Sequence, residues 1–240
     1  MNSNTLDILQ VDTESKVIFT DFRKVKLDHP ADLIFVDPPF GIDFKANMQT
    51  YNRTPDALSY SEVPKIDYPK FIKHLVNWSY KSLTDSGSMW LVSGWNNLRP
   101  VLNAVEDVGF IQLNHCIWKY QFGVFTKKKF TTSHYHLLLL VKNLKEYTFN
   151  KQEHYAEDVW DIKRPYHHGV KTAGNELPDQ LVERCIKTSS NSGDLVVDPC
   201  LGSGTTMKVA LSVNRKCIGI EVNPLIKQRI ITKLGLHLFR

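Results

Sequence analysis

The chain alternates between short apolar runs and longer segments in which apolar residues recur with helical spacing. The short runs are too brief and too apolar for amphipathic helices, so they are predicted to be buried strands. Interleaving of such strands with helices is typical of a parallel sheet that is covered by helices. The sequence therefore predicts an α/β fold, with a mostly parallel sheet and helices on both faces.

The alternation continues along nearly the whole chain. The predicted strands are 17–19, 32–36, 89–92, 113–118, 136–141, 195–197 and 217–220. The predicted helices are 68–83, 98–108, 178–188, 205–213 and 224–234. Pro178 and Pro224 suit first-turn positions, where the N–H that proline lacks has no helical partner. Two stretches, 43–67 and 122–172, break the rhythm and are expected to contain loops over a functional site.

Length and composition set the remaining limits. A chain of 240 residues suits one domain, 1–240, with an insertion. No stretch approaches the roughly 20 apolar residues that cross a bilayer, and the N-terminus lacks a secretion signal, so we expect no membrane contact and a cytoplasmic location. The net charge of +5 permits binding to a polyanion. The four cysteines form no C-x-x-C pair and are expected to be buried thiols.

The predicted strand 32–36 ends abruptly in Asp37-Pro38-Pro39-Phe40. Open α/β sheets bind ligands at the carboxyl ends of their strands, so this turn lies where chemistry is expected. Two consecutive prolines stiffen the turn, and its backbone carbonyls must find hydrogen-bond partners outside the sheet. A carboxylate at one end and a flat ring at the other match an aminated aromatic ring. A plain proline turn after a strand is the alternative interpretation.

A second strand, 195–197, is followed by an acid and a glycine-rich turn, 198–206. Glycines let the backbone approach a ligand closely, and the helix that follows offers free N–H groups. The turn lacks the Gly-Lys-Ser/Thr ending of a P-loop and the G-x-G-x-x-G spacing, which disfavours a triphosphate. About twenty residues later the strand 217–220 ends in Glu221, the usual position of an acid that holds ribose hydroxyls.

Together the two motifs resemble those of the DNA amino-methyltransferases, in the subgroup whose catalytic motif precedes the cofactor motif. Asp37-Pro38-Pro39-Phe40 is similar to the family's catalytic D-P-P-Y/F tetrapeptide. The turn 198–206 is similar to its cofactor loop, D-P-F-x-G-S-G-T-T, with Cys200 in place of the usual aromatic residue. The resemblance covers nearly the whole chain, although 174–178 departs from the family's pattern. It implies a single Rossmann-like methyltransferase domain that uses S-adenosyl-L-methionine.

The resemblance also implies roles for individual residues. Asp21 falls where the family has an acid near the adenine of the cofactor, and Pro178 lies where a helix begins beside the methionine moiety. The implied catalytic residues are Asp37, Pro38, Pro39 and Phe40. The implied cofactor-binding residues are Asp21, Phe22, Asp37, Pro178, Asp198, Cys200, Gly202, Ser203, Gly204, Thr205, Thr206, Glu221 and Asn223.

An exocyclic amine is a poor nucleophile, because its lone pair is delocalised into the ring. We expect Asp37 and the Pro38 carbonyl to accept the two amine hydrogens while Phe40 stacks on the base, so that positioning and electrostatics drive methyl transfer. The amine of a paired base is held inside the duplex, so the target base must be flipped out or already single-stranded. The expected reaction is methylation of the N6 amine of adenine in DNA, with restriction-modification as one setting.

A target-recognition insertion is expected at about 119–172, where cations and aromatic rings are concentrated. Cations suit phosphates, and aromatic rings suit unstacked bases. A solvated basic face with buried rings is the alternative interpretation for part of this region. The residues expected to contact nucleic acid are Lys119, Lys127, Lys128, Lys129, Lys163 and Arg164.

Alternative functions stay open at this stage. N4 methylation of cytosine uses the same chemistry, although the family commonly has Asp in the first motif position for adenine and Ser for cytosine. RNA is a rival substrate, because phosphate contacts carry little sequence information. An inactive nucleic-acid-binding subunit of a methyltransferase complex would keep the fold, but both motifs are intact here. The sequence does not distinguish a monomer from a homodimer or from a chain with a partner subunit.

Two further patterns are interpreted as unrelated to catalysis. Pro199-Cys200 could suggest the nucleophile of cytosine C5 methylation, but this thiol lies inside the predicted cofactor loop. His167-His168 could suggest a metal site, but adjacent histidines rarely point at the same ion and no nearby cysteine completes a set. We expect a phosphate or solvent contact for these histidines, and no metal.

Overall fold

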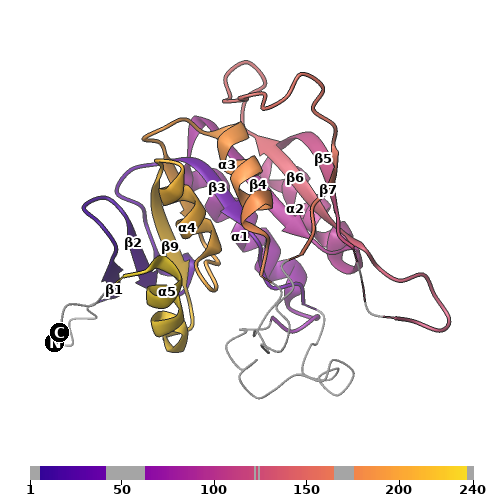
Figure 1. Ribbon diagram of the computed structural model, residues 1–240, viewed down its shortest axis with the longest axis horizontal. Coiled ribbons are helices and arrows are strands. Elements are labelled where there is room, and N and C mark those ends of the chain that lie inside the picture. The colour runs from indigo at the N-terminus through magenta and orange to yellow at the C-terminus, as the bar shows by residue number, and fades with distance from the viewer. Residues whose placement is uncertain (1–5, 42–62, 122, 124, 165–175, 237–240) are drawn as a thin grey trace.

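The computed structural model describes residues 6–41, 63–121, 123, 125–164 and 176–236. In this part of the chain the strands form one nine-stranded sheet with helices on both sides, as Figure 1 shows. The predicted α/β class is confirmed. From edge to edge the strands are β1 (Asp7–Gln10), β2 (Lys16–Phe19), β9 (Lys216–Glu221), β8 (Leu195–Asp198), β3 (Ala31–Val36), β4 (Leu83–Ser93), β6 (His134–Val141), β5 (Ile111–Lys119) and β7 (Val159–Asp161).

The α-helices divide between the two faces of the sheet. Helices α1 (Tyr68–Ser82) and α2 (Leu98–Val108) share one core with the sheet. Helices α3 (Asp179–Ser189), α4 (Thr205–Ser212) and α5 (Lys227–Leu234) share the other. Short 3-10 turns are η1 (Phe22–Lys24), η4 (Trp95–Asn97) and η5 (Pro224–Ile226).

The central strands of the sheet all point the same way. Strands β2, β9, β8, β3 and β4 pair in parallel, so their carboxyl ends meet at one edge. Strand β6 runs antiparallel between β4 and β5, and β1 is antiparallel to β2. The sheet is therefore mostly parallel, as predicted.

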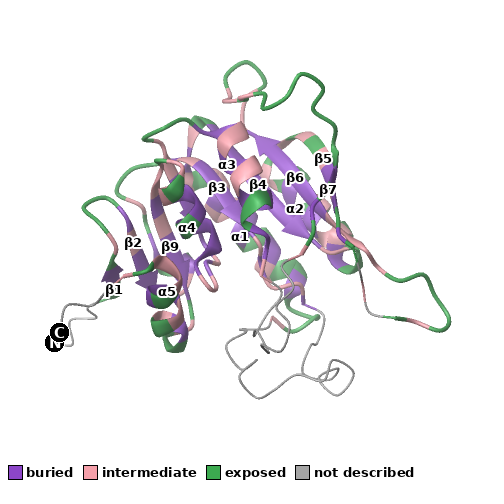
Figure 2. Cartoon of the chain, in the orientation of Figure 1, coloured by how far each residue is buried: buried purple, intermediate pink, exposed green. Residues whose placement is uncertain are grey.

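Successive residues of β3 show how one strand serves both cores. Leu33 and Phe35 pack under α3, α4 and α5, whereas Ile34 and Val36 pack under α1 and α2. All four side chains have no exposed surface, and the sheet is buried between its helices in Figure 2. Burial of each such side chain contributes about 1.5–3 kcal/mol. A strand buried on both faces has a continuous apolar sequence, which is the pattern that predicted it.

The predicted strands and helices are all present, and most differ from prediction by only a few residues at their ends. Strand β4 is the largest exception, because it begins at Leu83 rather than at residue 89. The polar residues after Leu83 concealed this early start. At the other end of the chain, the prediction of one helix over 224–234 was wrong in detail: η5 precedes α5.

Pro178 was predicted in the first turn of a helix, and the structure corrects this placement. Its ψ of 137° is extended, so Pro178 is the N-cap residue that precedes α3. Pro224 does lie in the first turn of η5.

Two strands were missed. In β1 only Leu9 is buried, and in β7 only Trp160 is buried. A strand with one buried residue gives no alternating pattern, so neighbours in the sheet define it rather than its own sequence. Among the described residues, no helix has the length and apolar character needed to span a membrane.

Candidate active site

Four acidic residues stand at the carboxyl ends of four neighbouring strands. Asp21 follows β2, Glu221 ends β9, Asp198 ends β8 and Asp37 follows β3. Because these strands are adjacent and parallel, the four side chains meet at one edge of the sheet. Burial raises the pKa of the Cys200 thiol well above its usual value, and the charges of all four acids raise it further. Cys200 therefore lies close enough to all four acids for their charges to act on its thiol.

The Cys200 thiol is held in its protonated form by this environment. Since the thiolate is the nucleophilic species, a cysteine beside four carboxyl groups is a weak nucleophile. This argues against the cytosine C5 chemistry that Pro199-Cys200 could suggest. Cys116, Cys185 and Cys217 are buried, as expected, whereas Cys200 keeps some exposure, so the expectation was wrong for this residue.

Asp37 has the most unusual environment of the four acids. Burial, with a smaller contribution from the charge of Asp198, raises the pKa of its carboxyl to about 7, while the charge of Arg164 acts in the opposite direction. The residue as a whole keeps partial access to solvent, although its carboxyl group is buried. Among the described residues, no donor forms a hydrogen bond to it. Asp37 is therefore available to a ligand.

The turn after Asp37 is held from outside the motif. The Asn97 side chain donates hydrogen bonds to the backbone carbonyls of Phe40 and Gly41, the latter at 3.3 Å. Asn97 is itself buried, at 8% exposure. The expectation that the turn's carbonyls find partners outside the sheet is met by this side chain. No sequence motif pointed to Asn97.

The Phe40 ring is partly exposed and fixed on two sides. Gly94 lies against it, since a Cβ on that glycine would meet the Phe40 ring at 3.4 Å. The Tyr135 ring packs edge-on against it, with ring centroids 5.2 Å apart. Phe40 thus presents an oriented aromatic surface in the same turn as Asp37.

The glycine-rich turn 198–206 is shaped by its own acid. Asp198 accepts a hydrogen bond from the Cys200 N–H at 2.9 Å and another from the Thr206 side chain. Burial nevertheless raises the pKa of Asp198 to about 7, because these hydrogen bonds only partly compensate for it. Gly202 and Gly204 have φ of 56° and 90°, in the left-handed region that favours glycine. The turn delivers the chain directly into α4, whose N-cap is Gly204.

Glu221 is joined to this turn by the backbone. Its two carboxylate oxygens accept hydrogen bonds from the N–H groups of Gly202, at 2.9 Å, and Asn223, at 2.8 Å. Burial raises its pKa, and these hydrogen bonds lower it. The Asn223 side chain accepts from the Leu225 N–H and caps η5. Glu221 therefore links β9 to the cofactor-like turn.

The hydroxyl groups of the turn are bound by a lysine that the sequence did not single out. Lys233 of α5 donates to Ser203 Oγ at 2.8 Å and to Thr205 Oγ1 at 2.9 Å. It also forms an ion pair with Glu176 at 2.9 Å. Burial raises the pKa of Glu176, but the hydrogen bond and charge of Lys233, together with the charge of Arg229, lower it below its usual value. This network braces the turn from the α5 side.

The remaining predicted cofactor residues differ in character. Asp21 caps η1 and binds Arg23 through both side chain and backbone, and the Arg23 side chain is the main cause of its lowered pKa. Phe22 is buried in the α1 face, with its ring 5.9 Å from that of Trp78, so it is a core residue in this structure. Pro178 is buried where α3 begins.

The predicted nucleic-acid residues differ in their exposure and in their partners. Lys127, Lys128 and Lys129 are exposed on the connection between β5 and β6, which projects from the sheet at the lower right of Figure 1. Phe125 and Phe130 flank them and are 80% and 99% exposed. The basic and aromatic character of this tip is therefore presented to solvent.

The other three cations of the set lie elsewhere. Lys119 is paired with Asp161 of β7 at 2.9 Å, and Lys163 is exposed. Arg164 is turned inward among aromatic rings near Asp37. His167 and His168 lie outside the described residues. Within the described ranges, no three His, Cys, Asp or Glu side chains are grouped as a metal site requires.

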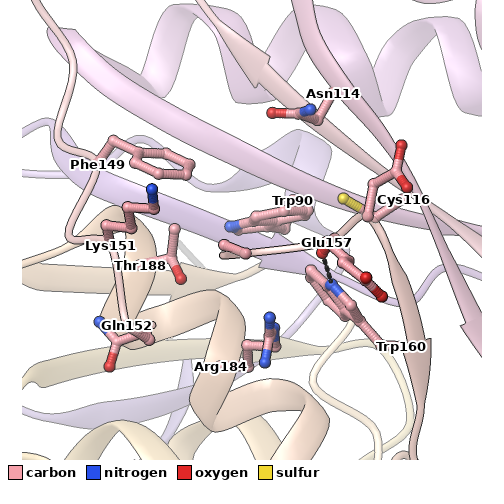
Figure 3. A pocket seen from close by; sticks show the side chains of 12 residues that line it. Trp90, Asn114, Cys116, Phe149, Lys151, Gln152, Glu157, Trp160, Arg184 and Thr188 are labelled. Carbon is pink, nitrogen blue, oxygen red and sulfur yellow. Dashed lines mark hydrogen bonds between the residues drawn. The ribbon is translucent and has the colours of Figure 1, made fainter. Parts of the chain in front are cut away.

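A small cavity of about 60 Å³ lies away from the acidic cluster. Figure 3 shows it between the sheet and the C-terminal half of α3, with Trp90, Cys116, Trp160 and Arg184 among its walls. It is remote from the strand ends where the acids converge. The chemistry of the groups, rather than this hollow, identifies the candidate active site.

Comparisons of sequence agree with this geometry. Residues 31–233 match the N6_N4_Mtase family, described as DNA methylase. The chain is 30% identical over 225 residues to the DNA adenine methyltransferase YhdJ of Escherichia coli K12, a match that covers 80% of this chain and 72% of YhdJ. It is 27% identical over 215 residues to the Type II methyltransferase M.HpaI of Haemophilus parainfluenzae, covering 82% of this chain. The chain spans 65% of the length of M.HpaI.

Solved structures show the same fold. The M1.HpyAVI–SAM complex matches with a TM-score of 0.71 and 19% identity, over 92% of this chain and 98% of that one. The cytosine-N4-specific PvuII DNA methyltransferase matches with a TM-score of 0.75 and 16% identity, over 95% and 89% of the two chains. The fold is thus that of known methyltransferases, and the family match over most of the sequence shows that this chain belongs to the DNA methylase family.

Proposed function

We propose that this protein transfers the methyl group of S-adenosyl-L-methionine to the exocyclic N6 amine of adenine in DNA, acting in the cytoplasm. One observation carries the proposal: the Asp37 carboxyl, which accepts no hydrogen bond from the described residues, lies in one turn with the oriented Phe40 ring and beside the Asp198 turn. An acceptor, a flat apolar ring and a glycine-rich cradle are what methyl transfer to an aromatic amine requires.

The chemistry follows from these groups. The Asp37 carboxylate and the Pro38 carbonyl accept the two amine hydrogens, which localises the nitrogen lone pair and aims it. S-adenosyl-L-methionine supplies an electrophilic methyl group on a sulfonium centre. As the N–C bond forms, the bond between the methyl carbon and sulfur would break and leave the neutral thioether S-adenosyl-L-homocysteine. The nitrogen would lose a proton, and a carboxylate whose pKa is about 7 suits its removal near neutral pH.

The chain's own residues fit this cofactor. Gly202 faces open space, since a Cβ built on it would meet only the Cys200 carbonyl oxygen, at 3.9 Å. Glu221 binds two backbone N–H groups, and a carboxylate has acceptor sites left for ribose hydroxyls. We assign the backbone of Gly202 and Gly204 to contact with the cofactor, and Glu221 to its ribose hydroxyls. The other predicted cofactor contacts stay predictions.

Adenine is favoured over cytosine as the target base. YhdJ, which is named a DNA adenine methyltransferase, shares 30% identity with this chain. The residue before Pro38 is Asp37 rather than the Ser that commonly marks cytosine in the family it resembles. N4 methylation of cytosine is the second candidate, because the PvuII enzyme with that specificity has a closely similar fold.

A nucleic acid suits the exposed loop 125–130. Three lysines stand between two exposed phenylalanine rings there. Lysines neutralise phosphates, and exposed rings can stack on unpaired bases. Because Lys119 is already paired with Asp161, we centre the phosphate contact on the three lysines of this loop.

The test is a methylation assay with labelled S-adenosyl-L-methionine. Single-stranded DNA, duplex DNA and RNA of matched sequence are each digested to nucleosides and analysed by mass spectrometry. N6-methyladenine from DNA is the expected product. N4-methylcytosine would move the assignment to the second candidate, and label found in RNA alone would exclude DNA as the substrate.

A further inference from the structure

Arg164 stands in a box of aromatic rings. Its guanidinium carbon lies 3.9 Å from the centroid of the Tyr120 ring, 5.1 Å from that of Tyr135 and 5.2 Å from that of Trp118. The Tyr135 ring in turn packs against Phe40. Cation–π contacts with several rings hold a guanidinium in one orientation. The box therefore extends from Arg164 to the ring that is proposed to stack on the target base.

The backbone beneath Arg164 is fixed as firmly as its side chain. The Arg164 N–H donates to Gln121 Oε1 at 2.8 Å, and Gln121 Nε2 donates back to the Arg164 carbonyl at 3.1 Å. Two residues earlier, the Ile162 carbonyl accepts from the Trp118 indole N–H at 2.7 Å. These hydrogen bonds attach the segment to the end of β5. Arg164 is thus a fixed part of the site rather than a cation on a free surface.

Two properties of the Arg164 side chain suggest a role beyond packing. Its Nε is buried and has no hydrogen-bond partner among the described residues. A buried donor without a partner costs about 1–3 kcal/mol, so such a group is expected to serve a ligand. Its charge also acts on the Asp37 carboxyl and lowers the pKa of that group against burial and Asp198. Arg164 is therefore close enough to the catalytic turn for its charge to act on Asp37.

We propose that Arg164 is a positioning residue for methyl transfer: its fixed guanidinium closes the aromatic side of the base pocket and provides the counter-charge of Asp37. The proposal rests on the proposed function. It also separates Arg164 from the lysines of the 125–130 loop, with which the sequence grouped it as a phosphate contact.

The counter-charge is needed because a base that enters the pocket expels water. Asp37 is then faced by the acid Asp198 and the Cys200 thiol, and both its burial and the charge of Asp198 favour its neutral form. A protonated Asp37 would lose acceptor capacity for the amine and could not take its proton. A guanidinium stays charged throughout the accessible pH range, so Arg164 favours the ionised form of Asp37 and opposes a further rise of its pKa.

The test is the pH dependence of kcat in Arg164→Gln. The acid limb of the pH–kcat profile reports the ionisation of Asp37. Without the guanidinium this limb should move to higher pH by about one unit. For a limb that starts near pH 7, kcat should fall about fivefold at pH 7 and recover by about pH 9. Arg164→Lys, which keeps the charge, should restore the position of the limb.

Arg184→Gln is the matched control. Arg184 also lies over an aromatic ring, that of Trp160 at 4.8 Å, and is ion-paired with Glu153, but it lines the remote cavity in Figure 3. Its loss should leave the pH profile unchanged. Thermal unfolding of each variant shows whether it folds, and Arg164→Met takes the place of Arg164→Gln if the latter does not.

Two readouts keep this proposal separate from the proposed function. Carbon-13 NMR titration of the Asp37 carboxyl, assigned with Asp37→Asn, compares its pKa in the wild type and in Arg164→Gln without any turnover. An unshifted Asp37 titration, or a kcat that falls equally at every pH, would reduce Arg164 to a structural role and overturn the proposal. A wild type that makes no methylated base refutes the proposed function, while the titration still decides the role of Arg164.

Discussion

The turns after β3 and β8 have similar sequences at their start, but their aspartates, Asp37 and Asp198, have different partners. Both Asp37 and Asp198 follow a buried parallel strand, and both precede a proline. Strands β3 and β8 are neighbours, and burial raises the pKa of both carboxyls to about 7. The difference is in their partners: Asp198 binds Cys200 and Thr206 of its own turn, whereas Asp37 binds no donor among the described residues.

The same local motif, a buried strand followed by aspartate and proline, can therefore have a structural role in one turn and a ligand-binding role in the other. In the β8 turn the acid binds Cys200 and Thr206, which stand before and after two glycines with left-handed backbone, so the carboxylate is part of the scaffold. In the β3 turn prolines and the distant Asn97 fix the backbone, which leaves the carboxylate free for a ligand. A buried charge that the fold does not satisfy indicates function, because it costs stability.

The largest effect is expected from Asp37→Ala compared with Asp198→Ala. Loss of one preorganised contact in the transition state should lower the turnover of Asp37→Ala by about a hundred-fold or more, with nearly unchanged affinity for S-adenosyl-L-methionine. Asp198→Ala should instead lower the affinity for S-adenosyl-L-methionine, because the Cys200 N–H loses its acceptor and the turn is no longer held in shape. Single-turnover kinetics and calorimetry separate the two defects. Near-normal turnover in Asp37→Ala would remove the basis of the proposed mechanism.

A smaller effect is expected from Gly204→Val. Its φ of 90° is strained for valine by roughly 1–3 kcal/mol, so the turn should distort and cofactor affinity should fall about tenfold or more. Gly193→Val is the matched control, because Gly193 has a φ of 89° and open space around it at the other end of β8. Equal affinity losses in the two variants would show that general strain, and not the turn, is responsible.

The two turns were predictable from the sequence because all their information is local. A strand that ends in an acid, followed by prolines or glycines, defines its own place at the carboxyl edge of a parallel sheet. The fold class followed from the same apolar runs, and the family match confirms the resemblance that the motifs suggested. The roles of the individual site residues stay predictions.

The supporting residues were not predictable, because tertiary contacts alone define them. Asn97 reaches Phe40 from 57 positions away, and Lys233 reaches Ser203 from 30 positions away. Neither has a sequence signature of its own. Arg164 was grouped with the surface lysines because composition records charge but not direction. Only packing distinguishes a guanidinium among buried rings from a cation in solvent.

The smallest effect concerns stability. A folded pKa of about 7, against 3.8 for an unperturbed carboxyl, means that the folded protein binds the Asp37 proton more tightly than the unfolded chain does. This contribution to stability is fully present below about pH 4 and is lost as the pH rises through 7. Ionisation of Asp37 therefore destabilises the folded protein at pH 8.

Asp37→Asn should accordingly be more stable than the wild type at pH 8, although we expect it to be inactive. The buried charge disappears, and so does its repulsion with Asp198, so we expect a gain of about 1–3 kcal/mol and a rise in Tm of roughly 2–10 °C. The gain should shrink towards pH 5, where Asp37 is already protonated in the wild type. Asp198→Asn should gain less, because its carboxylate already has donors in the turn.

Asp85→Asn, whose wild-type side chain is 94% exposed, is the control for a surface charge. Thermal unfolding at both pH values measures all three, and an unchanged or lower Tm for Asp37→Asn at pH 8 would mean that the fold satisfies Asp37 after all.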